Sequence, residues 1–205
     1  MKVLAINSSL RRGGESRTEL MLNHLVEGMR QAGAEAELVN LRDKTIKYCI
    51  GCFTCMTKTP GKCIQNDDMT NDLYPKWLAS DMVVYGTPLF SHTVNAPMKT
   101  FIERMFPISE PFLEKNDSGR WFHPLRQERP AAVVLSVCGF LEESAFEALS
   151  HYVNFMFHQS NPIAEIYRTT SQMMTQSIYK DKLDDILDAT QQAGRELVMS
   201  MAVSE

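Results

Sequence analysis

The chain has 205 residues, of which 44% are hydrophobic and 22% charged, and its formal net charge is −4. Such a composition is typical of a globular protein, and the length suits a single domain with a full-sized core. The mild acidity argues against nucleic acid as a partner, because nucleic-acid binding needs a basic surface. No run approaches the roughly 20 apolar residues of a membrane span, and the apolar run at the start is too short for a signal peptide, so we expect a soluble cytoplasmic protein.

The first third of the chain predicts a strand, a helix and a second strand. Residues 2–6 form a short apolar run, as expected of a buried parallel strand. A polar loop follows, and apolar residues then recur at helical spacing over 16–32, with Gly33 as the C-terminal cap. Residues 35–41 indicate a second strand.

The middle of the chain begins with a cysteine-rich segment, residues 46–66, which lacks periodicity and is predicted to be a loop. An aspartate at 67 or 68 can cap a helix that ends near residue 79. A buried strand is predicted at 81–85, and a helix at about 95–105.

The last part of the chain opens with a long irregular insertion, residues 107–130, which contains four prolines. Loops of this length in a folded domain are commonly lids. A strand is predicted at 131–137, a helix at 143–157, a strand at 163–167 and a closing helix at about 175–202.

Strand and helix therefore alternate five times, which predicts one α/β domain over residues 1–205: a doubly wound, five-stranded parallel sheet with helices on both faces. Ligands of such sheets bind beyond the carboxyl ends of the strands, where the strand order reverses. The least regular loops follow the first, third and fourth strands, and all of them are expected at that edge.

The loop after the first strand, Ser8-Ser9-Leu10-Arg11-Arg12-Gly13-Gly14-Glu15-Ser16, predicts a site for a phosphate group. It combines hydroxyls, backbone N–H groups and a helix N-terminus, which attract anions, and Arg11 can add a charged contact. Ser9, Arg11 and Ser16 are the candidate ligands. The alternative is a solvated loop in which Ser16 only caps the helix.

The loops after the third and fourth strands predict a site for a flat heterocyclic ring. Backbone groups of residues 86–92 can bind its polar edge while apolar side chains cover its face. The alternative is two ordinary turns with their aromatic residues in a core. The candidate contacts are Pro88, Leu89, Phe90, Ser91, Cys138 and Gly139.

Four of the five cysteines lie close together, at Cys49, Cys52, Cys55 and Cys63. A [4Fe–4S] cluster needs one ligand for each iron, and this spacing can wrap three ligands around a cube and return with a fourth. A structural zinc ion, a redox-active thiol pair or free thiols are the alternatives. Cys138 is distant in the sequence and is interpreted as packing near the heterocycle.

These motifs together resemble the NAD(P)H-dependent FMN reductase and iron–sulfur flavoprotein branch of the flavodoxin-like superfamily. The phosphate loop of that family reads G-S-P-R-x-x-G-N-T, and its ring loop is matched by Thr87-Pro88-Leu89-Phe90. Its D-D-M and K-x-F-x-D-R elements are matched by residues 67–69 and 99–104. Leu10 and Glu15 depart from the family pattern, and Glu15 is an unusual neighbour for a phosphate.

The resemblance implies an FMN-dependent oxidoreductase or electron-transfer flavoprotein of flavodoxin-like fold that takes electrons from NADH or NADPH. It implies a small-molecule or protein acceptor, a [4Fe–4S] cluster on the four clustered cysteines, and a homodimer or homotetramer. Trp121, Phe122 and His123 of the insertion are expected to form a lid over the flavin or a dimer contact, or else a satellite core. The alternative function is a zinc-stabilised interaction or regulatory module that has the flavodoxin fold without FMN.

Overall fold

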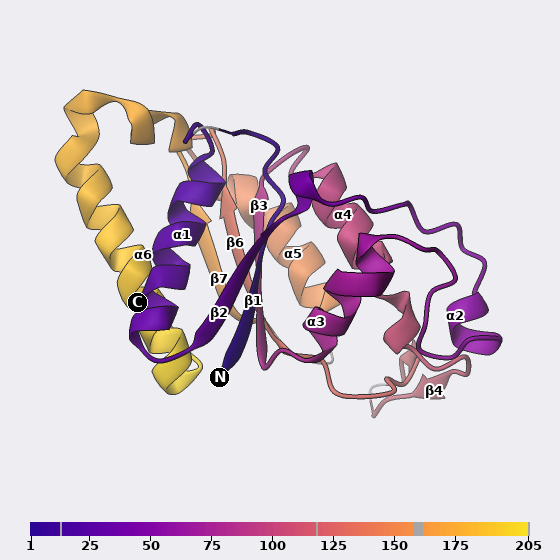
Figure 1. The fold of residues 1–205 in the computed structure, drawn as a ribbon. Coiled ribbons are helices and arrows are strands. Elements are labelled where there is room, and N and C mark those ends of the chain that lie inside the picture. The colour runs from indigo at the N-terminus through magenta and orange to yellow at the C-terminus, as the bar shows by residue number, and fades with distance from the viewer. Residues whose placement is uncertain (13, 118, 158–161, 205) are drawn as a thin grey trace.

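A five-stranded parallel sheet forms the centre of the computed structural model, which describes residues 1–12, 14–117, 119–157 and 162–204 (Figure 1). The strand order is β2-β1-β3-β6-β7, so the chain first moves to one side of β1 and then to the other. The expected doubly wound sheet is therefore confirmed, and the order reverses between β1 and β3. The strands are β1 (Lys2–Asn7), β2 (Glu35–Asn40), β3 (Met82–Pro88), β6 (Ala131–Val137) and β7 (Pro162–Arg168).

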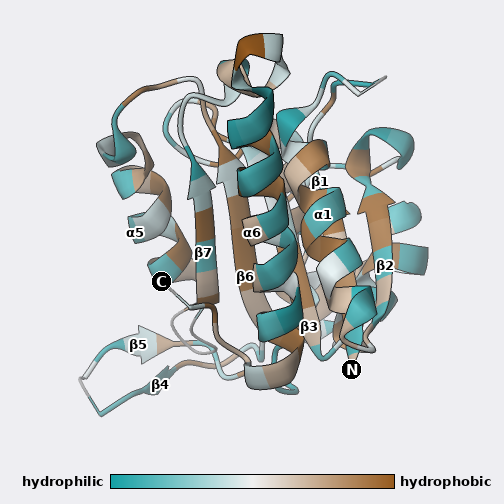
Figure 2. Cartoon of the chain, turned by 90° about the vertical axis from the view of Figure 1, so that its left-hand side faces the viewer, coloured by the Kyte–Doolittle hydropathy of each residue, from teal (hydrophilic) through white to brown (hydrophobic). Residues whose placement is uncertain are grey.

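One face of the sheet is covered by α1 (Arg17–Gln31) and α6 (Lys180–Ser200), which lie side by side in Figure 2. The two helices approach so closely that glycine is required at the crossing. A Cβ on Gly28 would lie 1.9 Å from the Gln191 carbonyl oxygen, and a Cβ on Gly194 would lie 2.1 Å from that of Leu25. Apolar residues of both helices pack on β1, β3 and β6, and the side of α6 that faces the viewer in Figure 2 is mostly hydrophilic.

The opposite face is covered by α3 (Tyr74–Leu78), α4 (Ala96–Glu103) and α5 (Glu147–Met156). A π-helical turn, η2 (Met69–Leu73), precedes α3, and Pro75 lies in the first turn of α3. The helix expected over 67–79 is therefore α-helical only in its second half. Helices on both faces are confirmed.

The remaining elements are short. A four-residue helix, α2 (Thr54–Thr57), interrupts the cysteine-rich loop, and an antiparallel pair, β4 (Glu114–Lys115) and β5 (Trp121–Phe122), forms in the insertion. The 3₁₀ turns are η1 (Leu41–Asp43), η3 (Phe106–Ile108), η4 (Glu143–Phe146), η5 (Ser171–Thr175) and η6 (Ser177–Tyr179). Within the described ranges no helix has the length and apolar character needed to cross a membrane.

The insertion lies at the amino-terminal edge of the sheet, away from the loops that follow the strands (Figure 1). Topology requires this position, because α4 runs back across the sheet and the chain must re-enter it at the start of β6. Of the three alternatives for Trp121, Phe122 and His123, this position does not suit a lid formed over the carboxyl edge by the same chain, whereas a dimer contact and a satellite core stay predictions. Trp121, Phe122 and His123 instead line a separate pocket beside α4 and α5.

Candidate functional site

A cleft of about 290 Å³ lies at the carboxyl ends of the strands, where their order reverses. It is lined by residues from the loops after β1, β3, β6 and β7. Eight of the nine residues proposed for the phosphate and ring contacts line this one cleft; Ser91 does not. The eight are Ser9, Arg11, Ser16, Pro88, Leu89, Phe90, Cys138 and Gly139.

The N-terminus of α1 forms the polar end of the cleft. The Ser16 side chain caps the helix, since its Oγ accepts a hydrogen bond of 3.1 Å from the Glu19 N–H. A capping hydroxyl that accepts one hydrogen bond still has its own hydrogen to donate. The Ser9 and Thr18 side chains line the same end, and both residues are buried. Hydroxyl donors and the positive end of the α1 dipole therefore meet here, as an anion requires.

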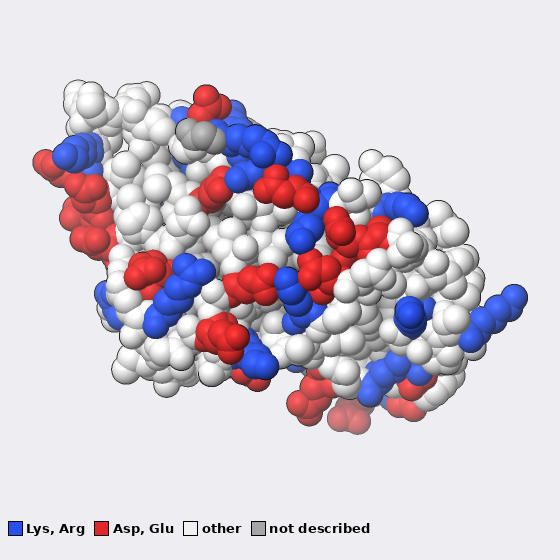
Figure 3. Space-filling view, viewed as in Figure 1, with Lys and Arg blue, Asp and Glu red and all other residues white. Residues whose placement is uncertain are grey.

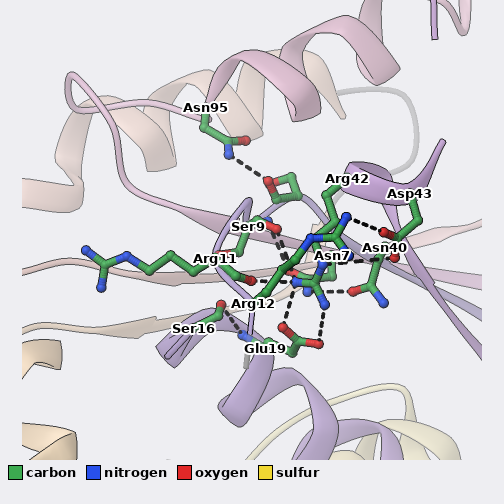
Figure 4. Close-up of polar contacts among 11 residues, drawn as sticks. Asn7, Ser9, Arg11, Arg12, Ser16, Glu19, Asn40, Arg42, Asp43 and Asn95 are labelled. Carbon is green, nitrogen blue, oxygen red and sulfur yellow. Dashed lines mark hydrogen bonds and ion pairs between the residues drawn. The ribbon is translucent and has the colours of Figure 1, made fainter. Parts of the chain in front are cut away.

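Arg42, which lies in η1 directly after β2, fixes the conformation of the loop between β1 and α1 (Figure 4). Its guanidinium binds both carboxylate oxygens of Glu19 at 2.7 and 2.8 Å. It also donates to the backbone carbonyl of Arg11 at 2.7 Å. The Arg11 side chain extends away from this network in Figure 4, so its guanidinium is not used by the loop itself.

Positive side chains gather over the loop between β1 and α1 (Figure 3). One of them, Arg12, is paired with Asp43 at 2.8 Å. Glu15, the unusual residue of the phosphate loop, is exposed and does not line the cleft. Its departure from the family pattern therefore places no negative charge inside the candidate phosphate site.

Asn95 joins the phosphate loop to the ring loop. Its side-chain Nδ2 donates to the Ser8 carbonyl at 2.8 Å, while its Oδ1 accepts from the Met98 N–H at 3.3 Å and so caps α4. Its own N–H donates to the Thr87 hydroxyl at 3.3 Å. One buried amide thus fixes the loops after β1 and β3 relative to one another.

The ring side of the cleft is apolar and open. Phe90 is 58% exposed, although it lines the cleft, and the backbone of Ser91 and His92 takes positive φ angles of 48° and 62°. This tight turn stacks the His92 ring on Phe140 with centroids 5.4 Å apart. The loops after β3 and β6 are therefore linked at the rim, where an exposed aromatic side chain can contact a flat ligand.

The four clustered cysteines line one small cavity of about 80 Å³ beside α2, away from the cleft. Burial raises the pKa of the Cys55 thiol, and the nearness of the other three thiols raises it further. The described residues contain no group of three or more His, Cys, Asp or Glu side chains placed to hold a single metal ion. Four thiolates on one zinc would have to converge at about 2.3 Å from it, whereas a cube takes one thiolate at each of four separate irons. In the described part of the chain the four thiols are not gathered around such a single-zinc position.

The two ends of the cysteine loop are clamped by a buried ion pair. Arg104 binds both carboxylate oxygens of Asp67 at 2.6 and 3.0 Å, and the two side chains are 1% and 0% exposed. Arg104 also donates to the Lys47 carbonyl at 2.6 Å, and the Lys47 N–H donates to Asp67 at 2.9 Å. Lys47 precedes the first cysteine and Asp67 follows the last, so the pair closes the base of the loop.

Comparison with known proteins agrees with the geometry. Residues 1–169 match the NADPH-dependent FMN reductase family, and the chain belongs to it. It is 39% identical over 107 residues to an iron–sulfur flavoprotein of Archaeoglobus fulgidus, covering 52% of this chain and 46% of that protein. It is 32% identical over 119 residues to one of Methanocaldococcus jannaschii, covering 58% and 59%. The chain thus spans about half the length of these relatives.

Solved structures share the fold at lower identity. An NAD(P)H:quinone oxidoreductase from Methanothermobacter marburgensis is 14% identical with a TM-score of 0.69, and the match covers 96% of each chain. An FMN-dependent NADH-azoreductase from Bacillus anthracis, in complex with FMN, is 14% identical with a TM-score of 0.68, covering 96% of this chain and 99% of that one. These likenesses establish the flavodoxin-like fold of the chain.

Sequence reasoning missed several residues of the cleft. Thr18, Asn95, Ser171 and Gln172 line it alongside the predicted residues. Asn95 carried a signal, because an asparagine directly before a predicted helix is a capping residue. Ser171 and Gln172 follow the fifth strand, so they lie at the carboxyl edge of the sheet together with the other three loops.

Proposed function

We propose that this chain is an FMN-dependent oxidoreductase that takes electrons from NADH or NADPH. The observation that carries the proposal is the single cleft at the reversal of strand order, with an anion-binding helix terminus at one end and an apolar rim at the other. FMN has the matching shape, a phosphate joined to a flat ring, and when bound it supplies hydride and electron transfer.

The residues of the cleft divide into two groups in this proposal. Ser9, Ser16 and Thr18 donate to the phosphate, assisted by the N-terminal N–H groups of α1 and by Arg11. The loop from Pro88 to Phe90 and the backbone at Gly139 hold the ring. Cys138 is buried behind the ring site, where burial raises the pKa of its thiol. That shift keeps the thiol protonated, so Cys138 acts as a packing side chain.

We further propose that Cys49, Cys52, Cys55 and Cys63 hold a [4Fe–4S] cluster, which passes single electrons when bound. The support is the shared cavity of the four thiols and the similarity to proteins named iron–sulfur flavoproteins. A small-molecule or protein acceptor, a homodimer or homotetramer, and a cytoplasmic location remain predictions.

A purification without oxygen tests these assignments together. The visible spectrum is recorded with iron, sulfide and zinc assays, and the flavin-free protein is then titrated with FMN and with riboflavin. The proposal expects flavin absorbance, about four irons per chain and tighter binding of FMN than of riboflavin, because riboflavin lacks the phosphate. Zinc in place of iron, with no flavin bound, would instead support an interaction module that kept only the fold.

A further inference from the structure

A second cavity, larger than the cleft, lies at the amino-terminal edge of the sheet. Its volume is about 670 Å³, against about 290 Å³ for the cleft, and the two share no lining residue. It is formed by α4, the insertion, the end of α5 and the start of the cysteine loop. We refer to it as the insertion pocket.

The walls of the insertion pocket are aromatic and largely open to solvent. Phe106, Trp121 and Phe155 are 41%, 60% and 55% exposed, and Phe122 completes the lining. Large apolar side chains that gather at one exposed place are typical of a binding surface. Aromatic walls favour a flat aromatic ligand, which can stack or pack edge-on against them.

The charged side chains of the pocket leave an excess of positive charge. Lys99 is paired with Glu103 at 2.7 Å, so these two cancel. The Arg120 guanidinium lies 4.4 Å from the centre of the Phe155 ring, and Arg129 donates to the Met156 carbonyl at 3.0 Å. Among the described residues, no acidic side chain forms an ion pair with Arg120 or Arg129.

Arg129 has a buried Nε without a hydrogen-bond partner in the described part of the chain. It is partly buried at the base of the insertion, and burial lowers the pKa of its guanidinium. An anion in the pocket would offset that desolvation, and a planar guanidinium suits a carboxylate or sulfonate, which can accept two parallel hydrogen bonds.

We propose that the insertion pocket binds a planar aromatic anion, with its rings against the aromatic walls and its acidic group at Arg129 and Arg120. Cys49 lines both this pocket and the cavity of the four cysteines, so the ligand lies against the cysteine loop. Binding requires neither FMN nor a cluster; only a role of the ligand in electron exchange rests on the proposed function.

The test is a calorimetric titration of the FMN-loaded, oxidised protein with anthraquinone-2-sulfonate, repeated on flavin-free protein. Trp121 gives a second signal, because the only other tryptophan, Trp77, is 1% exposed in the core. We expect binding with quenching of the Trp121 emission in both preparations. We also expect neutral 2-(hydroxymethyl)anthraquinone to bind at least about tenfold more weakly, since it lacks the charged acceptor.

Variants locate the site. Arg129→Gln and, on the exposed hairpin, Arg120→Gln are each expected to weaken binding by about tenfold, while Arg195→Gln on α6 is the matched control and leaves binding unchanged. Phe90→Ser at the cleft also leaves it unchanged. The proposal is overturned if neither pocket variant alters affinity, if Phe90→Ser abolishes binding, or if the neutral probe binds equally well. Failure to bind FMN would refute the proposed function but would leave the evidence for ligand binding in the insertion pocket unchanged.

Discussion

Replacing Asp67 by asparagine is expected to destabilise the protein by about 3–5 kcal/mol at pH 7, because Arg104 would remain buried without its counter-charge. Burial alone would raise the pKa of Asp67, but hydrogen bonds from Arg104 and from the Lys47 and Thr70 N–H groups outweigh it and lower the pKa from 3.8 to about 2. A shift of this size is worth about 2 kcal/mol of stability.

The pH dependence follows from the sign of that shift. The folded state holds the Asp67 proton less tightly than the unfolded chain, so the contribution is complete above the ordinary pKa and is lost as the pH falls towards 2. Urea unfolding followed by circular dichroism should therefore show a constant difference in the free energy of unfolding between parent and variant from pH 7 to 5. We call this difference the gap. By pH 3 the gap should narrow by about 1 kcal/mol.

The neighbouring residue gives a matched control. Asp68 accepts one backbone hydrogen bond, from the Thr45 N–H at 2.6 Å, which an asparagine side chain can also accept. Asp68→Asn should therefore cost less than about 1 kcal/mol. Equal effects of the two variants, or a gap for Asp67→Asn that does not change with pH, would refute the reasoning.

Three other substitutions test the cleft and the helix crossing. Ser16→Ala should cost about 1 kcal/mol of stability as a lost cap and weaken FMN about ten- to a hundredfold in fluorescence titrations; an equal loss for riboflavin would contradict a phosphate contact. Arg42→Met leaves Glu19 without its partner and should lower the free energy of unfolding by about 1–3 kcal/mol together with FMN affinity; unaltered affinity would show that the loop keeps its shape alone. Gly194→Ala should destabilise by about 1–3 kcal/mol in thermal unfolding, whereas helix propensity alone predicts a gain.

The central strands β1, β3 and β6 were predictable because they are buried on both faces. Residues 3–6 of β1 and 131–135 of β6 form unbroken apolar runs, and such runs can be recognised in a sequence without knowledge of the neighbouring strands. Helix starts were less predictable. The last helix was expected from about residue 175 but begins at Lys180, because two 3₁₀ turns precede it and Gln176 is extended. No glycine or proline marks that break.

Residues of the candidate site could be predicted where their position follows from the order of strands and loops. They could not be predicted where their role depends on contacts with residues far away in the sequence. Ser16 and Phe90, which line the cleft, could be proposed from the sequence because each lies in a loop after a predicted strand, and all such loops meet at one edge. Arg42 was missed because its partners Glu19 and Arg11 lie 23 and 31 residues away. The short hairpin at Trp121 was missed because two-residue strands leave no periodic pattern.

Because α1 and α6 cross closely, the end of the family match and the end of the folded core fall at different places in the chain. The match to the family ends at residue 169, before α6 begins at Lys180. Yet α6 covers one face of the sheet and presses against α1, whose N-terminus carries Ser16. An expression clone trimmed to the recognisable family segment would therefore leave part of the core bare and the phosphate-side helix unsupported. The segment that matches the family is therefore shorter here than the segment that packs into one core.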